Sequence, residues 1–143
     1  MERIILHCDM NNYYATVECM LNPVLRGRAV AVCGSQDDRH GIVLAKSEEA
    51  KKYGVNTGDV IWEARRKCSE LITVPPHFNE YAKYSKLARE IYYGYTDQIE
   101  PFGIDECWLD VTGSTMLFGD GYEIAHKIKE EIKSELGLTI SVG

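Results

Sequence analysis

The sequence predicts an α+β fold in which a ferredoxin-like βαββαβ sheet carries a small α/β lobe inserted after its first helix. Short apolar runs and two long amphipathic stretches follow one another in the order strand, helix, lobe, helix, strand pair, helix, strand. Residues 104–111 alternate apolar and polar, which is the pattern of a strand with one buried face. Pro75–Pro76 interrupts the chain and marks the end of the lobe.

The first strand is predicted over residues 3–9 and the first helix over residues 11–21. We expect an Asn side chain to cap this helix and Asn22–Pro23 to end it, since proline cannot continue a helix. Its buried face is predicted from three apolar residues, Val17, Met20 and Leu21. The lobe is predicted to contain strands 28–33, 41–45 and 71–74, helix 48–53 ending at Gly54, and helix 60–68 capped by Asp59.

Two long helices are predicted after the proline pair. Helix 79–95 places its tyrosines and aliphatic residues at three- and four-residue spacing, so most of these tyrosines are expected in the core. Helix 121–136 repeats isoleucine every four residues and ends at Gly137. Strands 104–111 and 138–142 complete the predicted sheet, and the two helices should pack on its apolar face.

Three carboxylates border the apolar strands. Asp9 ends the run 4–8, and Asp105 and Glu106 stand between Gly103 and the run 107–111. Carboxylate oxygens are hard ligands of the kind that Mg²⁺ prefers. Because a strand would send Asp105 and Glu106 to opposite faces, both can reach one metal site only if the chain bends near Gly103. From residue 97 to residue 123 there are seven acids and no Lys or Arg, so clustered acids there need a compensating cation.

Composition limits the classes of protein. The chain has 143 residues, 45% hydrophobic and 27% charged, as in an ordinary soluble globular protein of one domain or two small lobes. No apolar stretch approaches the ~20 residues of a membrane span, and the N-terminal apolar run is too short for a secretory signal, so we expect a cytoplasmic protein without membrane contact. Five cysteines without C-x-x-C spacing indicate reduced thiols and no zinc site.

Four stretches carry a resemblance to a known family. They are residues 9–18 (DMNNYYATVE), Asn22–Pro23, 103–106 (GIDE) and 109–110 (LD). In this order they resemble the catalytic motifs of the Y-family translesion DNA polymerases, and residues 26–32, 54–59 and 141–143 resemble further family stretches. The resemblance implies a palm formed by residues 1–18 and 76–143, incomplete at its C-terminus, with fingers at 19–75. It also implies that the chain is a fragment without the thumb and little-finger domains.

The resemblance implies template-directed addition of deoxynucleotides to a primer 3′-hydroxyl during DNA damage tolerance and repair. Asp9, Asp105 and Glu106 match the catalytic, metal-binding carboxylates, and Met10 would add a backbone carbonyl. Two Mg²⁺ ions are implied as cofactors, and Mn²⁺ can substitute for them. The implied partners are primer–template DNA, deoxynucleoside triphosphates and the replication sliding clamp, which would bind through the missing C-terminal region.

Four residues match nucleotide-binding positions of the family. Tyr14 matches the steric gate that excludes a ribose 2′-hydroxyl. The backbone amides of Asn12 and Tyr13 open a helix, where anions are favoured, and should meet the triphosphate. Lys51 stands where many members have a phosphate-gripping arginine, whereas Glu48 replaces a tyrosine, so we expect Glu48 to turn away and Lys46 or Lys51 to make the contact.

Two other functions remain open at this level. A nucleotide cyclase has the same strand order and also binds two metals, although it needs neither a sugar gate nor a template-covering lobe. A polymerase-like DNA-binding module without activity would also keep the fold. Asn11 departs from the aspartate of the polymerase IV branch, and with residues 49–51 it looks more like the catalytic subunit of polymerase V, so the subfamily stays open.

Overall fold

The computed structural model describes residues 2–143, which form two compact units. The first unit, here called the sheet unit, joins the stretch ending at Asn11 to Asn79–Gly143. The second, here called the lobe unit, is Asn12–Phe78. The first helix packs on the strands of the lobe unit and belongs to that unit. The boundary between palm and fingers that was expected after residue 18 lies inside this helix. Between Glu2 and Gly143 no helix is long and apolar enough to cross a membrane.

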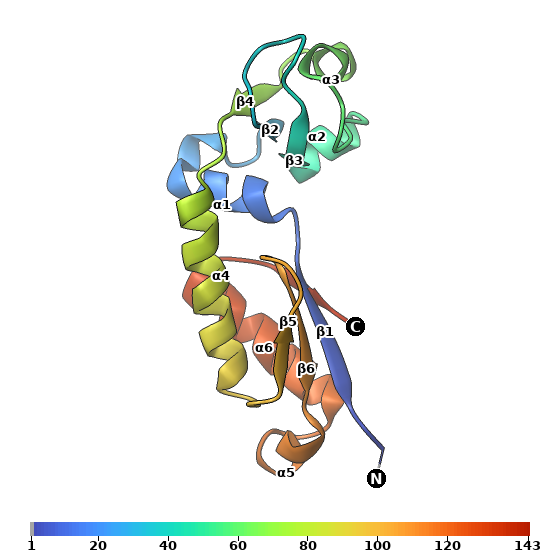
Figure 1. Cartoon of the computed structure of the whole chain (residues 1–143), viewed down its shortest axis with the longest axis vertical. Helices are drawn as coiled ribbons and strands as arrows, with labels where there is room; N and C mark the ends of the chain where they lie inside the picture. The colour runs from blue at the N-terminus through green and yellow to red at the C-terminus, as the bar shows by residue number, and fades with distance from the viewer. Residues whose placement is uncertain (1) are drawn as a thin grey trace. The chain divides into compact units, whose positions relative to one another are not determined.

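The sheet unit is built on four antiparallel strands (Figure 1). They are β1 (Ile5–Met10), β5 (Ile99–Pro101), β6 (Glu106–Asp110) and β7 (Ile140–Val142), in the spatial order β5-β6-β1-β7. The first and third strands of the unit therefore lie in the middle of the sheet and the second and fourth at its edges. This is the ferredoxin-like βαββαβ order, so the predicted fold class is confirmed.

Helices α4 (Phe78–Tyr93) and α6 (Gly121–Leu136) bury their apolar stripes against the sheet. Tyr81 and Tyr92 of α4 are buried, but Tyr84 is only partly buried and Tyr93 is 56% exposed, so the prediction that most of these tyrosines lie in the core is confirmed only in part. Helix α6 buries Ile124, Ile128 and Ile132. Asp120 caps α6 by accepting a hydrogen bond from the Glu123 amide, and Gly137 ends it in the left-handed conformation. A 3₁₀ turn (Thr112–Ser114) and the short α5 (Thr115–Phe118) connect β6 to α6.

The lobe unit contains α1 (Tyr13–Leu21), β2 (Val30–Cys33), β3 (Val43–Lys46), α2 (Glu48–Lys52), α3 (Ile61–Lys67) and β4 (Ile72–Val74). A 3₁₀ turn, Pro23–Leu25, follows α1. The sheet has the order β3-β2-β4, with β2 antiparallel to β3 and parallel to β4. Its core is made of small and branched side chains from these strands and helices, including Val43, Ile61 and Leu71. The lobe unit thus has a hydrophobic core of its own.

Three local predictions are wrong. The Asn side chain does not cap α1, because the N-cap residue Asn12 has a left-handed backbone and directs its side chain elsewhere. Leu21 is 42% exposed, since it is the last residue of a short helix and lies beyond the packed face. Asp59 does not cap α3 because its carboxylate accepts hydrogen bonds from the Asn56 amide and the Lys67 ammonium instead.

Candidate active site

Two of the predicted carboxylates lie opposite each other on the central strands of the sheet unit. Asp9 of β1 pairs with Glu106 of β6 in the antiparallel register. Their neighbours Cys8 and Cys107 are buried on the helix-covered face, so strand alternation places Asp9 and Glu106 on the open face. Both carboxylates are half-buried. The ladder of backbone hydrogen bonds therefore holds these two side chains as cross-strand neighbours.

Asp105 lies just before β6, on the bend that the sequence predicted. Gly103 has a φ of 77°, a left-handed conformation that glycine adopts without a Cβ clash, and Gly103–Asp105 form a bend. The Asp105 carbonyl accepts a hydrogen bond of 2.9 Å from the Met10 amide, which ties the bend to the end of β1. Asp105 is thus freed from strict strand alternation and lies beside Asp9 and Glu106.

Three side-chain hydrogen bonds that sequence analysis missed stabilise the structure around these carboxylates. The buried Ser85 hydroxyl on α4 donates to the carbonyl of Ile104, and Arg89 donates to Ser85 Oγ at 3.0 Å. On the other side, Ser141 Oγ of β7 donates to Asn11 Oδ1 at 2.8 Å. Two of these contacts join residues far apart in sequence, so no local pattern announces them.

The pKa of Asp105 shows that the three carboxylates interact. It is raised above the ordinary value of 3.8, first by burial and then by the negative charges of Asp9 and Glu106. A hydrogen bond from its own backbone amide acts in the opposite direction and only partly offsets these effects. Ionised Asp105 is therefore held at a cost that a bound cation would reduce.

His7 and Trp108 form the next cross-strand pair along the same face. Their rings stack with centroids 4.4 Å apart, and His7 Nε2 lies 3.6 Å from Glu106 Oε1. The imidazole therefore flanks the Glu106 carboxylate and limits the directions in which it can turn. Sequence analysis did not select His7, although the period of two already placed it on the same face as Asp9.

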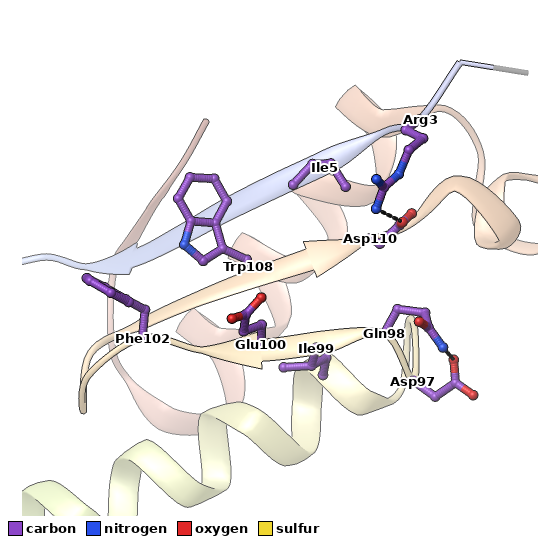
Figure 2. Close-up of a pocket in the computed structure, with 9 residues that line it drawn as sticks. All are labelled: Arg3, Ile5, Asp97, Gln98, Ile99, Glu100, Phe102, Trp108 and Asp110. Atoms are coloured by element: carbon purple, nitrogen blue, oxygen red, sulfur yellow. Dashed lines mark hydrogen bonds and ion pairs between the residues drawn. The ribbon is translucent and has the colours of Figure 1, made fainter.

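Beyond this pair the open face contains a hollow of about 660 Å³ (Figure 2). Trp108 and Phe102 border it, and an ion pair of 3.1 Å between Arg3 and Asp110 closes its far end. The remaining charged lining residues are acids, Asp97 and Glu100. Because the lining cation Arg3 is already paired with a carboxylate, this hollow does not favour a phosphate backbone.

The lobe unit holds the four residues expected to bind nucleotide. Asn12 is the N-cap of α1, and its carbonyl accepts from the Thr16 amide at 2.9 Å. Tyr13 is buried, whereas Tyr14 is half-buried and packs edge-on against Phe78 with ring centroids 5.9 Å apart. Lys51 is exposed on the last turn of α2. Tyr14 therefore has a ring held by an aromatic neighbour and still partly accessible.

Glu48 does not turn away from the start of α1, contrary to the prediction. The Asn12 side chain donates a hydrogen bond of 2.6 Å from Nδ2 to Glu48 Oε1. The left-handed backbone of Asn12 explains this contact, since it takes the side chain off its own helix. The Glu48 carboxylate thus lies next to Asn12, one of the residues expected to bind a triphosphate.

Helix α1 is held by a contact between a buried carboxylate and a half-exposed histidine ring. Glu18 is 3% exposed, and both its carboxylate oxygens lie 2.8 Å from His77 Nδ1. His77 directly follows Pro75–Pro76 at the end of the lobe unit. A buried carboxylate needs such a partner, so this contact anchors α1 to the segment that leaves the lobe unit.

Comparison with known proteins decides the family. Residues 8–143 match the family model described as impB/mucB/samB family. A DNA polymerase IV from Acetivibrio thermocellus is 61% identical over the whole chain. A chimeric Y-family polymerase of Dbh and Dpo4 superposes with a TM-score of 0.91 at 33% identity over 97% of the chain, and an insertion ternary complex of Dbh DNA polymerase with 0.90 at 34% over 97%. The chain belongs to the Y-family DNA polymerases.

Membership in the Y family implies a dependence on divalent metal ions. The chain spans 36% of the length of the Acetivibrio relative and 41% of each of the two solved chains, so it corresponds to a part of a Y-family polymerase. The resemblance that the motifs indicated is confirmed. Two relatives named DNA polymerase IV are 61% and 45% identical to this chain, although Asn11 departs from the aspartate of that branch.

The three carboxylates fit a divalent metal of this family by their chemistry. They offer hard oxygen donors, and the pKa of Asp105 is raised first by burial and then by the charges of Asp9 and Glu106, effects that a bound cation would offset. The Met10 side chain is buried, and the role of its backbone carbonyl as a metal ligand stays a prediction. Within residues 2–143 no three His, Cys, Asp or Glu side chains already form a closed metal cluster. Metal binding therefore requires the carboxylates to turn toward a common point.

Proposed function

We propose that this chain is the catalytic portion of a translesion DNA polymerase that adds deoxynucleotides to a primer 3′-hydroxyl opposite a template. The observation that carries the proposal is that Asp9 and Glu106 are cross-strand neighbours on the open face of the sheet unit, near enough to Asp105 to interact with its charge. Family membership supports the same reaction, since relatives of this chain are named DNA polymerase IV. Primer–template DNA and deoxynucleoside triphosphates are the corresponding substrates.

Asp9, Asp105, Glu106 and the Met10 carbonyl would hold Mg²⁺, for which Mn²⁺ can substitute. Two such ions, when bound, make a hydroxyl a better nucleophile and neutralise charge on a departing pyrophosphate. The protein's own contribution is to hold the backbones of these residues close together, so that only side-chain rotation is needed to bring the carboxylates to a common point. The β1–β6 register fixes Asp9 and Glu106, the Gly103 bend fixes Asp105, and His7 limits the rotation of Glu106.

In the lobe unit, we assign nucleotide binding to the start of α1 and to α2. The backbone amides of Asn12 and Tyr13 would bind the triphosphate, because helix N-termini favour anions. Lys51 would add a positive charge from α2. The Tyr14 ring would lie under the sugar and exclude a 2′-hydroxyl by collision, with Phe78 supporting it from the side.

Primer extension by the protein that carries this chain tests the proposal. We expect Mg²⁺-dependent and Mn²⁺-dependent extension of a primer on undamaged and lesion-bearing templates. A parallel reaction with nucleoside triphosphates and no primer tests the cyclase alternative, which would give a cyclic nucleotide. A protein that binds DNA but neither extends a primer nor cyclises a nucleotide would instead be an inactive polymerase-like module.

The sugar gate has its own test in Tyr14→Ala. Removing the ring opens room for a 2′-hydroxyl, so ribonucleotide incorporation should rise by roughly tenfold or more relative to deoxynucleotide incorporation. Tyr14→Phe is the matched control, because it keeps the ring and should keep the discrimination. Unchanged sugar selectivity in Tyr14→Ala would remove Tyr14 from this role.

A further inference from the structure

The Glu48 carboxylate is hydrogen-bonded to Asn12, the first residue of the predicted triphosphate site. Asn12 Nδ2 donates to Glu48 Oε1 at 2.6 Å, which is a short, charge-assisted hydrogen bond. Both residues belong to the lobe unit, so the contact lies within one compact part of the structure. Glu48 therefore competes electrostatically with any anion that binds the α1 amides.

The backbone on both sides of the contact is held in place. Asn12 has φ 45° and ψ 44°, and among residues 2–143 it is the one non-glycine residue with positive φ. Glu48 follows the N-cap Ser47, whose buried hydroxyl donates to the Arg28 carbonyl and accepts from the Val30 amide, each at 2.9 Å. The Asn12–Glu48 contact is exposed to solvent, but it joins two residues whose backbone positions are fixed.

The neighbouring charges do not remove the conflict between Glu48 and a triphosphate. Glu49 and Lys51 lie on the same short helix, but neither makes the contact with Asn12. Two like charges about 4 Å apart in a water-like dielectric weaken binding by roughly fivefold, and by more where water is partly excluded. A neutral side chain at position 48 would lack this penalty.

We propose that Glu48 sets the nucleotide affinity of this polymerase. Its carboxylate is hydrogen-bonded to the N-cap residue of α1 and therefore repels a triphosphate that binds the α1 amides. Glu48 thereby raises the nucleotide concentration at which synthesis begins. This inference rests on the proposed polymerase function and adds to it a determinant of substrate affinity.

The test compares Glu48→Gln with Glu49→Gln in the protein that carries this chain. Both variants remove one negative charge from the same turn of α2, and the carboxamide oxygen introduced by Glu48→Gln can still accept the hydrogen bond from Asn12. The measurements are the KM for deoxynucleotides in primer extension and the Kd for Mg²⁺-complexed dATP by calorimetry. Glu48→Gln should lower both constants about fivefold with little change in kcat, whereas Glu49→Gln should change them much less.

A second variant tests the hydrogen bond between Asn12 and Glu48. Asn12→Gly removes the hydrogen-bond donor while keeping a residue that tolerates positive φ. It should lower the Kd for inorganic tripolyphosphate by a smaller factor than Glu48→Gln, and the double variant should match Glu48→Gln alone. If the two substitutions lower this Kd independently, so that their factors multiply in the double variant, Glu48 does not act through its hydrogen bond with Asn12.

The outcomes separate this inference from the proposed function. If the protein extends primers and Glu48→Gln binds nucleotide no better than Glu49→Gln, Glu48 is not an affinity determinant and the inference fails alone. If neither the native protein nor any variant extends a primer or binds Mg²⁺-complexed dATP, the inference and the polymerase function fail together. Tighter binding in Glu48→Gln, with kcat preserved, supports both.

Discussion

The two units position their candidate functional residues by different means. In the sheet unit the carboxylates are placed by an antiparallel ladder, in which Asp9 and Glu106 have no freedom to change partners without shifting the whole strand. In the lobe unit the corresponding residues depend on individual side-chain contacts, Asn12 with Glu48 and Glu18 with His77. The first arrangement is set by backbone register, and the second can be altered by a single substitution.

The largest expected effect comes from removing a carboxylate that the ladder positions. Asp105→Ala or Glu106→Ala should reduce primer extension by about a thousandfold or more, since electrostatic stabilisation of the reacting charges is lost. Circular dichroism should show an intact fold, because neither side chain is in the core. Glu100→Ala is the control, an exposed acid on the neighbouring strand β5. Substantial extension by Asp105→Ala would contradict the assignment of the site.

The independence of the two cores can be tested next. Leu109→Ala removes a fully buried side chain at the centre of β6 and should cost about 3 kcal/mol of folding stability. Hydrogen exchange should accelerate over residues 106–110 while the amides of β2 and β3 keep their protection. Val43→Ala, in the core of the lobe unit, should give the reverse pattern. Loss of protection in both units with either variant would show that they unfold as one.

Breaking the contact between Glu18 and His77 in the lobe unit should have a smaller effect. His77→Ala leaves the Glu18 carboxylate buried without this partner and should cost about 1–3 kcal/mol in urea unfolding. His40→Ala is the control, because its contact with Asp37 is exposed and should contribute little. Equal stabilities of the two variants would mean that Glu18 is satisfied without His77.

The smallest effect concerns the contact between Asp59 and Lys67. The hydrogen bond from the Lys67 ammonium lowers the pKa of Asp59 below its ordinary value of 3.8. An acid with a lowered folded-state pKa stabilises the fold above its unfolded pKa, and this contribution is lost as pH falls through the folded value. Asp59→Asn should therefore cost about 0.5–1 kcal/mol at pH 7 and almost nothing near pH 2. A difference that stays constant with pH would exclude this charge effect.

Periodicity was enough to predict the features that depend on regular backbone. Alternation along β6 gave the buried and open faces, and the bend at Gly103 followed from the need to bring Asp105 and Glu106 to one site. The order of strands and helices was enough to predict the ferredoxin-like sheet. In each case the prediction depends on residues that are close together in the sequence, so it can be made from a single sequence.

The contacts that escaped prediction join distant residues through single side chains. Ser85 holds the Ile104 carbonyl, and Glu18 meets His77, across separations at which no periodic pattern operates. The left-handed conformation of Asn12 was also missed, because asparagine favours both helix caps and positive φ. This backbone conformation directs the Asn12 side chain to Glu48. The prediction that Glu48 turns away therefore failed because the conformation of one residue was missed.

The β1–β6 pairing has a consequence for how such a protein can change length. Almost a hundred residues, including the whole lobe unit, separate Asp9 from Glu106, yet the two are brought together by the pairing of β1 with β6. Insertions or deletions in the loops between them would leave this meeting point untouched. One residue gained or lost inside β1 would instead put Cys8 or Met10 where Asp9 belongs and turn a carboxylate into the core. Loops of the lobe unit can therefore change length without shifting this strand pairing, but there is no comparable freedom within the six residues of β1.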